Sequence, residues 1–147
     1  MPLAPTMPSP QGLDFIKRYQ GLSLEKYCDE DGLWLIGYGH LIRDHETFEA
    51  PITHWLADTL FTLDVDYYLR VLHQCVRSPL TQSQFDAVLS LAFSLGPEAV
   101  QKSPIVDCIN QQNFQSALAL WQGEGERQSS LAVQRQAELA LFQTDIR

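Results

Sequence analysis

The chain has 147 residues, of which 45% are hydrophobic, and its formal net charge at pH 7 is −8. This length and composition allow one sizeable core and exclude a disordered polymer. The negative charge disfavours binding to nucleic acid, and no apolar run approaches the roughly 18 residues that a membrane span needs.

The N-terminal segment, MPLAPTMPSP, is rich in proline. Because proline blocks helix formation, we expect residues 1–9 to form a flexible tail. The segment lacks the basic and apolar regions of a secretory signal peptide, which predicts a cytoplasmic protein.

A first helix is predicted from Pro10 to Tyr19. Ser9 can cap its N-terminus, proline suits the first helical position, and Gly21 is suited to end it. The following residues predict a turn at 29–32 and a strand at 33–37. We therefore expect a small antiparallel sheet after the first helix.

The rest of the chain has a helical pattern of apolar residues. Predicted helices cover residues 53–76, 84–95, 103–110, 113–121 and 130–142, with caps at Thr53, Thr81, Ser103, Asn113 and Ser130. Gly123 and Gly125 predict a polar loop over 122–129. The apolar helix at 84–95 is expected at the centre of the fold. The predicted fold class is α+β, with a small antiparallel sheet lobe and a larger helical lobe in one domain over 10–147.

The stretch FIKRYQGLSLEKYCDEDGLWLIGYGHLI, residues 15–42, resembles the start of the phage-type lysozymes, the endolysins of glycoside hydrolase family 24. That family carries a catalytic Glu, an Asp nine residues later and a Thr six residues after the Asp. Here these places hold Gln20, Asp29 and Leu35. The surrounding scaffold residues match the family pattern, namely Gly21, Tyr27, Gly32, Ile36, Gly37, Tyr38, Gly39 and His40.

The two substitutions bear directly on the chemistry. Cleaving a glycosidic bond needs a proton donor and, on the opposite face, a base or nucleophile. The amide of Gln20 cannot supply the proton, and Leu35 cannot orient a water molecule. Asp29 is either the base or simply a turn former. The resemblance thus implies a lysozyme-like pseudoenzyme, of phage or prophage type, that serves in binding or protein interaction. The alternative is a peptidoglycan muramidase that is active through Asp29 or was inactivated by an engineered Glu-to-Gln change.

Other candidate site residues follow from the same resemblance. It implies a binding cleft with contributions from Trp34, Tyr38, His40, Phe93 and Ser94. For His40 it implies an ion pair with Asp64 that raises the histidine pKa, and a catalytic role is the alternative. Two further tryptophans, Trp55 and Trp121, are expected in the core.

The implied ligand is a glycan strand of peptidoglycan, whereas the acidic surface favours a basic protein partner. We therefore expect the groove near Gln20, Trp34, Leu35 and Phe93 to be closed or covered by such a partner. No cofactor and no metal are expected, and the three cysteines are interpreted as buried free thiols. Release to the periplasm would need a holin or another export route.

Overall fold

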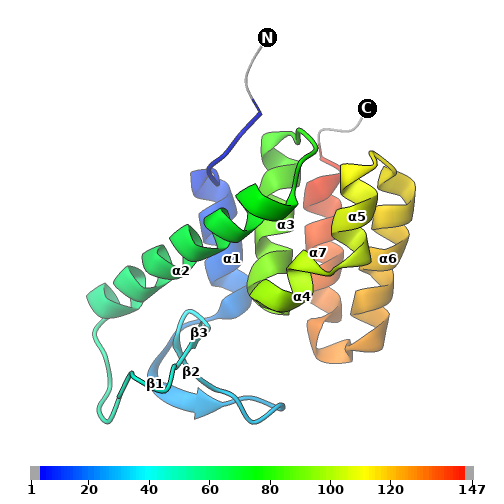
Figure 1. Cartoon of the computed structure of the whole chain (residues 1–147). Helices are drawn as coiled ribbons and strands as arrows, with labels where there is room; N and C mark the ends of the chain where they lie inside the picture. Colours follow the sequence, from blue (N-terminus) through cyan, green and yellow to red (C-terminus); the bar gives the residue numbers. More distant parts are fainter. Residues whose placement is uncertain (1–3, 145–147) are drawn as a thin grey trace. The chain divides into compact units, whose positions relative to one another are not determined.

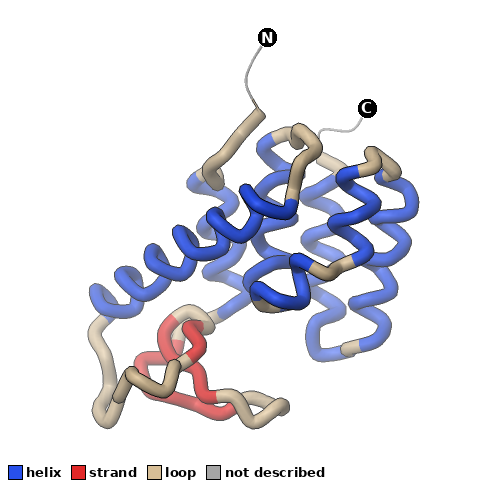
Figure 2. The backbone as a smooth tube through the Cα atoms, viewed as in Figure 1, coloured by secondary structure: helices blue, strands red, loops and turns tan. Residues whose placement is uncertain are grey.

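The computed structural model describes residues 4–144, which form helices and one small sheet (Figures 1 and 2). In chain order the elements are α1 (Pro10–Gln20), β1 (Ser23–Cys28), β2 (Trp34–Gly37), β3 (His40–Leu41), α2 (His54–Cys75), α3 (Gln82–Leu95), α4 (Pro97–Gln101), α5 (Pro104–Asn110), α6 (Phe114–Arg127), the 3-10 turn η1 (Ser129–Leu131) and α7 (Ala132–Phe142). This order confirms the α+β class. No helix formed by the described residues combines the length and apolar character that crossing a bilayer requires.

The chain divides into two compact units. Ile16–Tyr67 forms the unit that contains the sheet, here called the sheet unit. The helical unit combines the segment up to Phe15 with the segment from Tyr68 onward. A single domain over 10–147 stays a prediction, and residues 1–3 of the predicted tail lie outside the described residues.

The sheet unit contains an antiparallel sheet in the order β1-β2-β3. In its register, Tyr27 pairs with Leu35 and Ile36 pairs with His40. Because side chains alternate along a strand, Ile36 points to one face, where it is fully buried. That face packs on a cluster made with the start of α2, formed by Ile36, Ile52, Ala57 and Leu60 with Leu24, Tyr38, Ile42, Phe48 and Leu56 around it.

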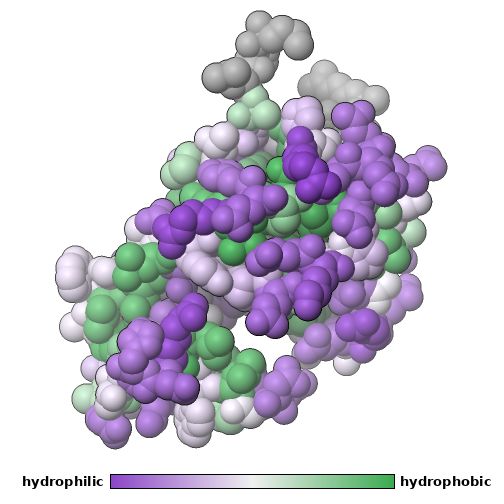
Figure 3. All heavy atoms as spheres, in the orientation of Figure 1, coloured by the Kyte–Doolittle hydropathy of each residue, from purple (hydrophilic) through white to green (hydrophobic). Residues whose placement is uncertain are grey.

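The helical unit is built around α3, in which every residue from Gln84 to Ala92 is buried. Helix α3 packs against α7, α7 against α6, and α6 against α5. Thr81 caps α3, and the backbone N–H of Thr81 donates to the Gln84 side chain, which completes the predicted capping box. On the face drawn in Figure 3, hydrophilic side chains dominate with apolar ones between them, as expected of helices that bury one side.

The segment before α1 is attached to the helical unit by polar contacts. The backbone N–H and the hydroxyl of Ser9 both donate to the carboxylate of Asp86, which is buried in α3. Ser9 also accepts from the Gly12 N–H, as the predicted cap requires. Closer to the N-terminus, the Thr6 carbonyl lies 3.0 Å from Nε2 of His73. Residues 6–9 are therefore held by α2 and α3.

Three expectations about secondary structure are wrong. The predicted loop at 122–129 does not form, because α6 continues through Gly123 and Gly125 to Arg127. A Cβ on Gly125 would lie 3.0 Å from Cβ of Arg135, so this glycine permits close packing of α6 on α7 rather than a turn. Ser130 lies within η1 and caps no helix, and the short helix α4 has no counterpart in the prediction.

Two expectations about burial are also wrong. Trp55 is 74% exposed at the start of α2, whereas Trp121 is fully buried as expected. The helical pattern of apolar residues correctly predicted a helix at Trp55 and at Trp121. However, the Trp55 side chain lies on the solvent-exposed face of α2. Cys28 is exposed, and Cys75 and Cys108 are only partly buried, so the cysteines are free but are not fully buried.

Candidate functional site

Gln20 is the last residue of α1, and its side chain is partly buried against the loop between β2 and β3. Gly39 in this loop has a φ of +72°, a conformation that favours glycine. A Cβ added at Gly39 would collide with the amide oxygen of Gln20. The positive φ explains the glycine in this turn, and the overlap shows that the Gln20 side chain lies directly against the GYGH segment.

Asp29 lies directly after β1 and organises the turn that leads to β2. Its Oδ1 atom accepts hydrogen bonds from the backbone N–H groups of Asp31 and Leu33, each at 2.9 Å. Its own backbone N–H donates to the Leu33 carbonyl, and its carbonyl accepts from Gly32. These bonds are those of an Asp turn former, the simpler of the two roles considered for this residue.

Leu35 lies in the middle of β2 and is partly buried. Its Cα partners are Tyr27 on β1 and Leu41 on β3, so the two leucines and the tyrosine form a row on one face of the sheet. Burial, and next the charge of Asp29, raises the pKa of Tyr27 above its ordinary value. This face therefore presents a hydrocarbon side chain where the family carries a hydroxyl.

Trp34 precedes Leu35 and therefore points to the opposite face of the sheet. Its Cα partner is Cys28, and its side chain is 49% exposed. The ammonium group of Lys26 lies 5.4 Å from the centre of its ring. The structure does not bring the Trp34 and Leu35 side chains together, although the sequence led us to expect both in one groove.

His40 on β3 is buried and forms the predicted pair with Asp64 on α2. Its Nδ1 atom lies 2.9 Å from Asp64 Oδ2, and its Nε2 atom lies 3.0 Å from Glu46 Oε1. Burial lowers the pKa of His40, but the hydrogen bonds and charges of Asp64 and Glu46 outweigh it and raise the pKa overall. Glu46 lies in the irregular connection between β3 and α2. Nothing in the sequence there predicted that Glu46 would be the second partner of His40.

The pKa of Glu46 shifts in the opposite sense. Burial raises it, but the hydrogen bond from the Arg43 N–H and the contacts with His40 lower it overall. The imidazole thus lies between two carboxylates, both of which favour its charged form. With both ring nitrogens engaged, His40 links β3 to α2 and to the connection after β3.

The remaining cleft candidates lie in different surroundings. Tyr38 packs edge-on against Phe61, with Lys17 5.0 Å above its ring, and belongs to the core of the sheet unit. Phe93 and Ser94 belong to the end of α3 in the helical unit, where Phe93 stacks on Tyr68 with ring centres 4.8 Å apart. A common cleft for these residues and Gln20 stays a prediction.

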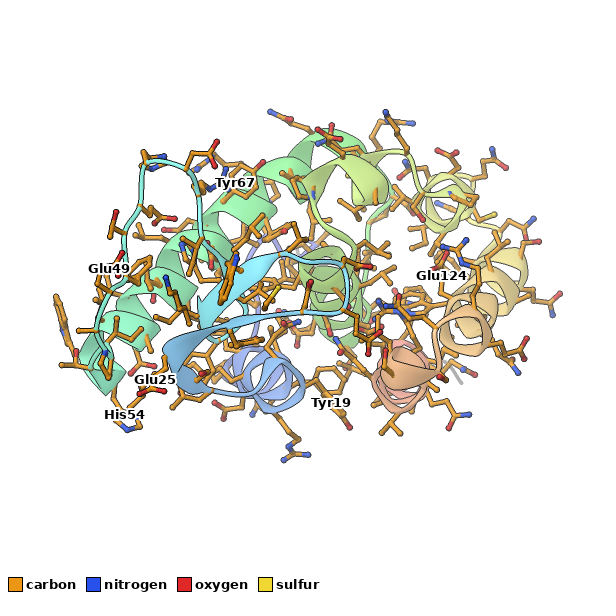
Figure 4. The ribbon with its side chains drawn as sticks, turned by 90° about the horizontal axis from the view of Figure 1, so that it is seen from below. Tyr19, Glu25, Glu49, His54, Tyr67 and Glu124 are labelled. Atoms are coloured by element: carbon orange, nitrogen blue, oxygen red, sulfur yellow. The ribbon has the colours of Figure 1, made fainter. Side chains whose placement is uncertain are left out.

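Other ionisable groups of the sheet unit lie near these positions in the sequence. Glu25 lies on β1, Tyr19 lies one residue before the end of α1, and both are labelled in Figure 4. Glu30 and Asp31 are exposed in the turn that Asp29 organises. Among the described residues, no three His, Cys, Asp or Glu side chains could together hold a metal ion.

Known proteins share both the sequence and the fold of this chain. The sequence profile of the family described as phage lysozyme matches residues 17–138. The endolysin of Acyrthosiphon pisum secondary endosymbiont phage 1 is 33% identical over 144 residues, covering 92% of this chain and 97% of that protein. The endolysin of Salmonella phage P22 is 32% identical over 140 residues, covering 91% of this chain and 96% of that protein.

Among solved structures, the muramidase domain of SpmX from Asticaccaulis excentricus superposes with a TM-score of 0.78 at 30% identity, covering 91% of this chain and 95% of that one. A P22 lysozyme mutant superposes with a TM-score of 0.74 at 30% identity, covering 92% of this chain and 97% of that one. These relatives and the matched profile confirm the resemblance inferred from residues 15–42. The chain is a member of the phage lysozyme family, with its lysozyme-like α+β fold.

Proposed function

We propose that this protein is a phage lysozyme-fold pseudoenzyme, used for binding or protein interaction rather than for hydrolysis of peptidoglycan. The observation that carries the proposal is Gln20, an amide at the place of the family's acidic Glu. An amide can hydrogen-bond a sugar oxygen but cannot protonate a leaving group. A missing general acid costs about two to four decades of rate.

The surroundings of the two other family positions support the same reading. Leu35 lies between Tyr27 and Leu41 in the register of the sheet, and its own hydrocarbon side chain cannot orient an attacking water. Asp29 uses Oδ1 to hold the turn before β2. A lysozyme scaffold can therefore retain Asp29 for folding even where no hydrolysis is required.

The second candidate function is that of its endolysin relatives, a muramidase that cuts the glycan strands of peptidoglycan. It is favoured by the family match over residues 17–138 and by the presence of Asp29. In that case another acid replaces Gln20, or the Gln stands where the natural protein has Glu. The ligand is then the glycan strand rather than a basic protein.

A turbidity assay on purified cell walls separates the two functions. The chain as given should clear walls at least about three decades more slowly than an endolysin of the family. Gln20→Glu should raise the rate, and Gln20→Glu/Leu35→Thr should raise it further. Gln20→Asn is the matched control, because it changes this side chain without adding a proton donor.

Two results would contradict the proposal. Clearing by the unaltered chain at a rate typical of endolysins, lost in Asp29→Ala, would mean that another group acts as the acid. Equal rates for Gln20 and Gln20→Glu with full folding of both would mean that this position does not decide activity. Sedimentation of the inactive chain with walls then measures whether glycan binding survives.

A further inference from the structure

A pocket of about 280 Å³ opens in the sheet unit, apart from the three family catalytic positions. Residues of β1, β2 and the connection after β3 line it, namely Lys26, Trp34, Ile42, Arg43, Asp44, Glu46, Thr47, Phe48 and Glu49. Gln20, Asp29 and Leu35 are not among them, and Leu35 points to the other face of the sheet. The pocket is therefore separate from the three family catalytic positions.

The wall of the pocket is held in place by the buried histidine network. The Glu46 carboxylate accepts from the Arg43 N–H at 2.9 Å and contacts His40 Nε2 at 3.0 Å. The Glu46 backbone N–H donates to the Arg43 carbonyl, which closes a turn. Phe48 in turn packs edge-on against the His40 ring. These contacts form the pocket before any ligand arrives, which reduces the ordering cost of binding.

The pocket combines an aromatic side chain with apolar ones. Trp34 is half-exposed at its edge, and Ile42 and Phe48 are partly buried against the core of the sheet unit. The Lys26 ammonium group lies 5.4 Å from the Trp34 ring centre. The electron-rich face of the indole is thus already in contact with a cation from the same chain.

Two carboxylates that line the pocket have no cationic partner in the described part of the chain. Asp44 and Glu49 are exposed, and neither makes a hydrogen bond or ion pair within residues 4–144; Glu49 is labelled in Figure 4. Arg43, the second cation of the rim, has its guanidinium group 5.6 Å from the Tyr67 ring centre. The sheet unit as a whole has four Lys and Arg side chains against ten Asp and Glu side chains. Its field therefore attracts cations.

We propose that this pocket binds a lysine or arginine side chain from a basic segment of a partner protein. The cation lies over the Trp34 indole in the place of Lys26, and the carboxylates of Asp44 and Glu49 neutralise it. The proposal gives the partner of the proposed function a docking site. It stands on different residues from Gln20, so wall-clearing assays and docking assays can fail independently.

The test uses the fluorescence of Trp34 in the full chain. Trp55 is replaced by Phe, because it is also exposed and would report unrelated events. Hexalysine and hexaarginine serve as probes, and hexaglutamate is the negative control. We expect a saturable fluorescence change with both basic peptides. The affinity of Trp34→Leu, measured by calorimetry, should be about tenfold lower, a loss within the range of a partly desolvated cation–π contact.

Charge variants distinguish the pocket from general acidity. Asp44→Asn/Glu49→Gln should weaken hexalysine binding about tenfold, as expected when two ionic contacts are removed. Glu124→Gln/Glu126→Gln on α6 changes the net charge by the same amount and should leave the affinity within about twofold. Lys26→Gln should strengthen binding, because it removes the resident competitor. Circular dichroism confirms that each variant is folded.

Three outcomes would overturn the proposal. The first is equal weakening by the two pairs of charge variants, which would indicate attraction by net charge alone. The second is weaker rather than stronger binding in Lys26→Gln. The third is Trp34-dependent binding of N-acetylglucosamine oligomers without binding of hexalysine, which would make the pocket a glycan subsite.

Discussion

The Nδ1 atom of His40 lies 2.9 Å from Oδ2 of Asp64, while the opposite ring nitrogen lies 3.0 Å from Glu46. One imidazole thereby joins strand β3, helix α2 and the connection between them. His40 is 7% exposed, so these charge-assisted contacts lie largely out of water, where they are stronger than surface ion pairs. The last residue of the GYGH motif is therefore part of the framework of the sheet unit.

The first prediction concerns the pH dependence of stability. The folded pKa of His40 is raised, so its contribution is complete below the unfolded value of 6.5 and is lost as pH rises through the folded pKa. The folded pKa of Glu46 is lowered, so its contribution is complete above 4.5 and is lost as pH falls through the folded pKa. Between pH 4.5 and pH 6.5, the stabilising contributions of both His40 and Glu46 are therefore complete. Urea unfolding should therefore give a larger free energy of unfolding at pH 5.5 than at pH 8.5.

His40→Asn should reduce that difference between pH 5.5 and pH 8.5. Asp64→Asn should cost roughly 1.5 to 3 kcal/mol at pH 5.5, the range for a hydrogen bond to a charged group. The exposed His54 provides the control, and His54→Asn should keep the profile of the unaltered chain. An unchanged profile in His40→Asn would show that other groups cause the pH dependence.

The second prediction separates the two roles of Asp29. Asp29→Ala removes the acceptor of two backbone hydrogen bonds and should cost roughly 1 to 2 kcal/mol of stability. Asp29→Asn keeps an acceptor oxygen and should cost much less. Thermal unfolding measures both effects. In the Gln20→Glu/Leu35→Thr background, Asp29→Asn should still abolish wall clearing if the carboxylate is the base, although stability is retained.

The third prediction concerns a buried ion pair in the helical unit. Glu138, which is 0% exposed, accepts from Arg135 Nη1 at 2.8 Å, Trp121 Nε1 at 3.0 Å and Ser90 Oγ at 2.5 Å. Arg135→Met leaves a buried carboxylate without its charged partner and should cost roughly 3 to 5 kcal/mol. Arg135→Met/Glu138→Leu should cost less than the sum of the two single variants, because it also removes the orphaned charge.

Chemical unfolding followed by Trp121 fluorescence tests this coupling. Arg127→Met is the control, because that side chain is 80% exposed and its contact with Glu124 is 3.8 Å long. It should change stability by less than about 0.5 kcal/mol. Strict additivity of the two single costs at Arg135 and Glu138 would contradict the network.

The fourth prediction concerns the attachment of the N-terminal segment. Asp86→Ala removes the acceptor of both Ser9 hydrogen bonds and should cost roughly 1 to 3 kcal/mol. The same variant should also be cleaved faster within the segment that precedes Pro10 in limited proteolysis, because fewer contacts hold residues 6–9. Asp107→Ala, on the separate helix α5, is the control for loss of an acidic side chain. Equal cleavage of the unaltered chain and Asp86→Ala would mean that other contacts hold the segment.

Local chemistry predicted most helix starts in this fold. Ser9, Thr53 and Thr81 each accept from a backbone N–H in the first turn of the helix that follows, as their side chains allow. The same reasoning failed at Gly123 and Gly125. Its local signal indicated a turn, but at Gly125 the packing of α6 on Arg135 of α7 uses the missing side chain instead. Tertiary packing of this kind cannot be inferred from neighbours in the sequence.

The candidate site shows the same division. The family pattern identified the pair of His40 with Asp64, because the motif and the helix position together specify it. It gave no indication of Glu46, which reaches the imidazole from an irregular connection. The exposure of Trp55 was also missed, since a helical period shows that residues share a face but not whether another element covers that face.

The contacts of the GYGH segment have a consequence for how such sequences are classified. Gly39 lies against the Gln20 side chain at the end of α1, and His40 joins three segments of the sheet unit, so both residues have structural roles that do not depend on catalysis. The motif is therefore a marker of architecture, and its presence does not report turnover. Genome surveys that assign lytic activity to phage lysozyme relatives should score the residue at the end of α1 and the residue two places before GYGH as a separate criterion.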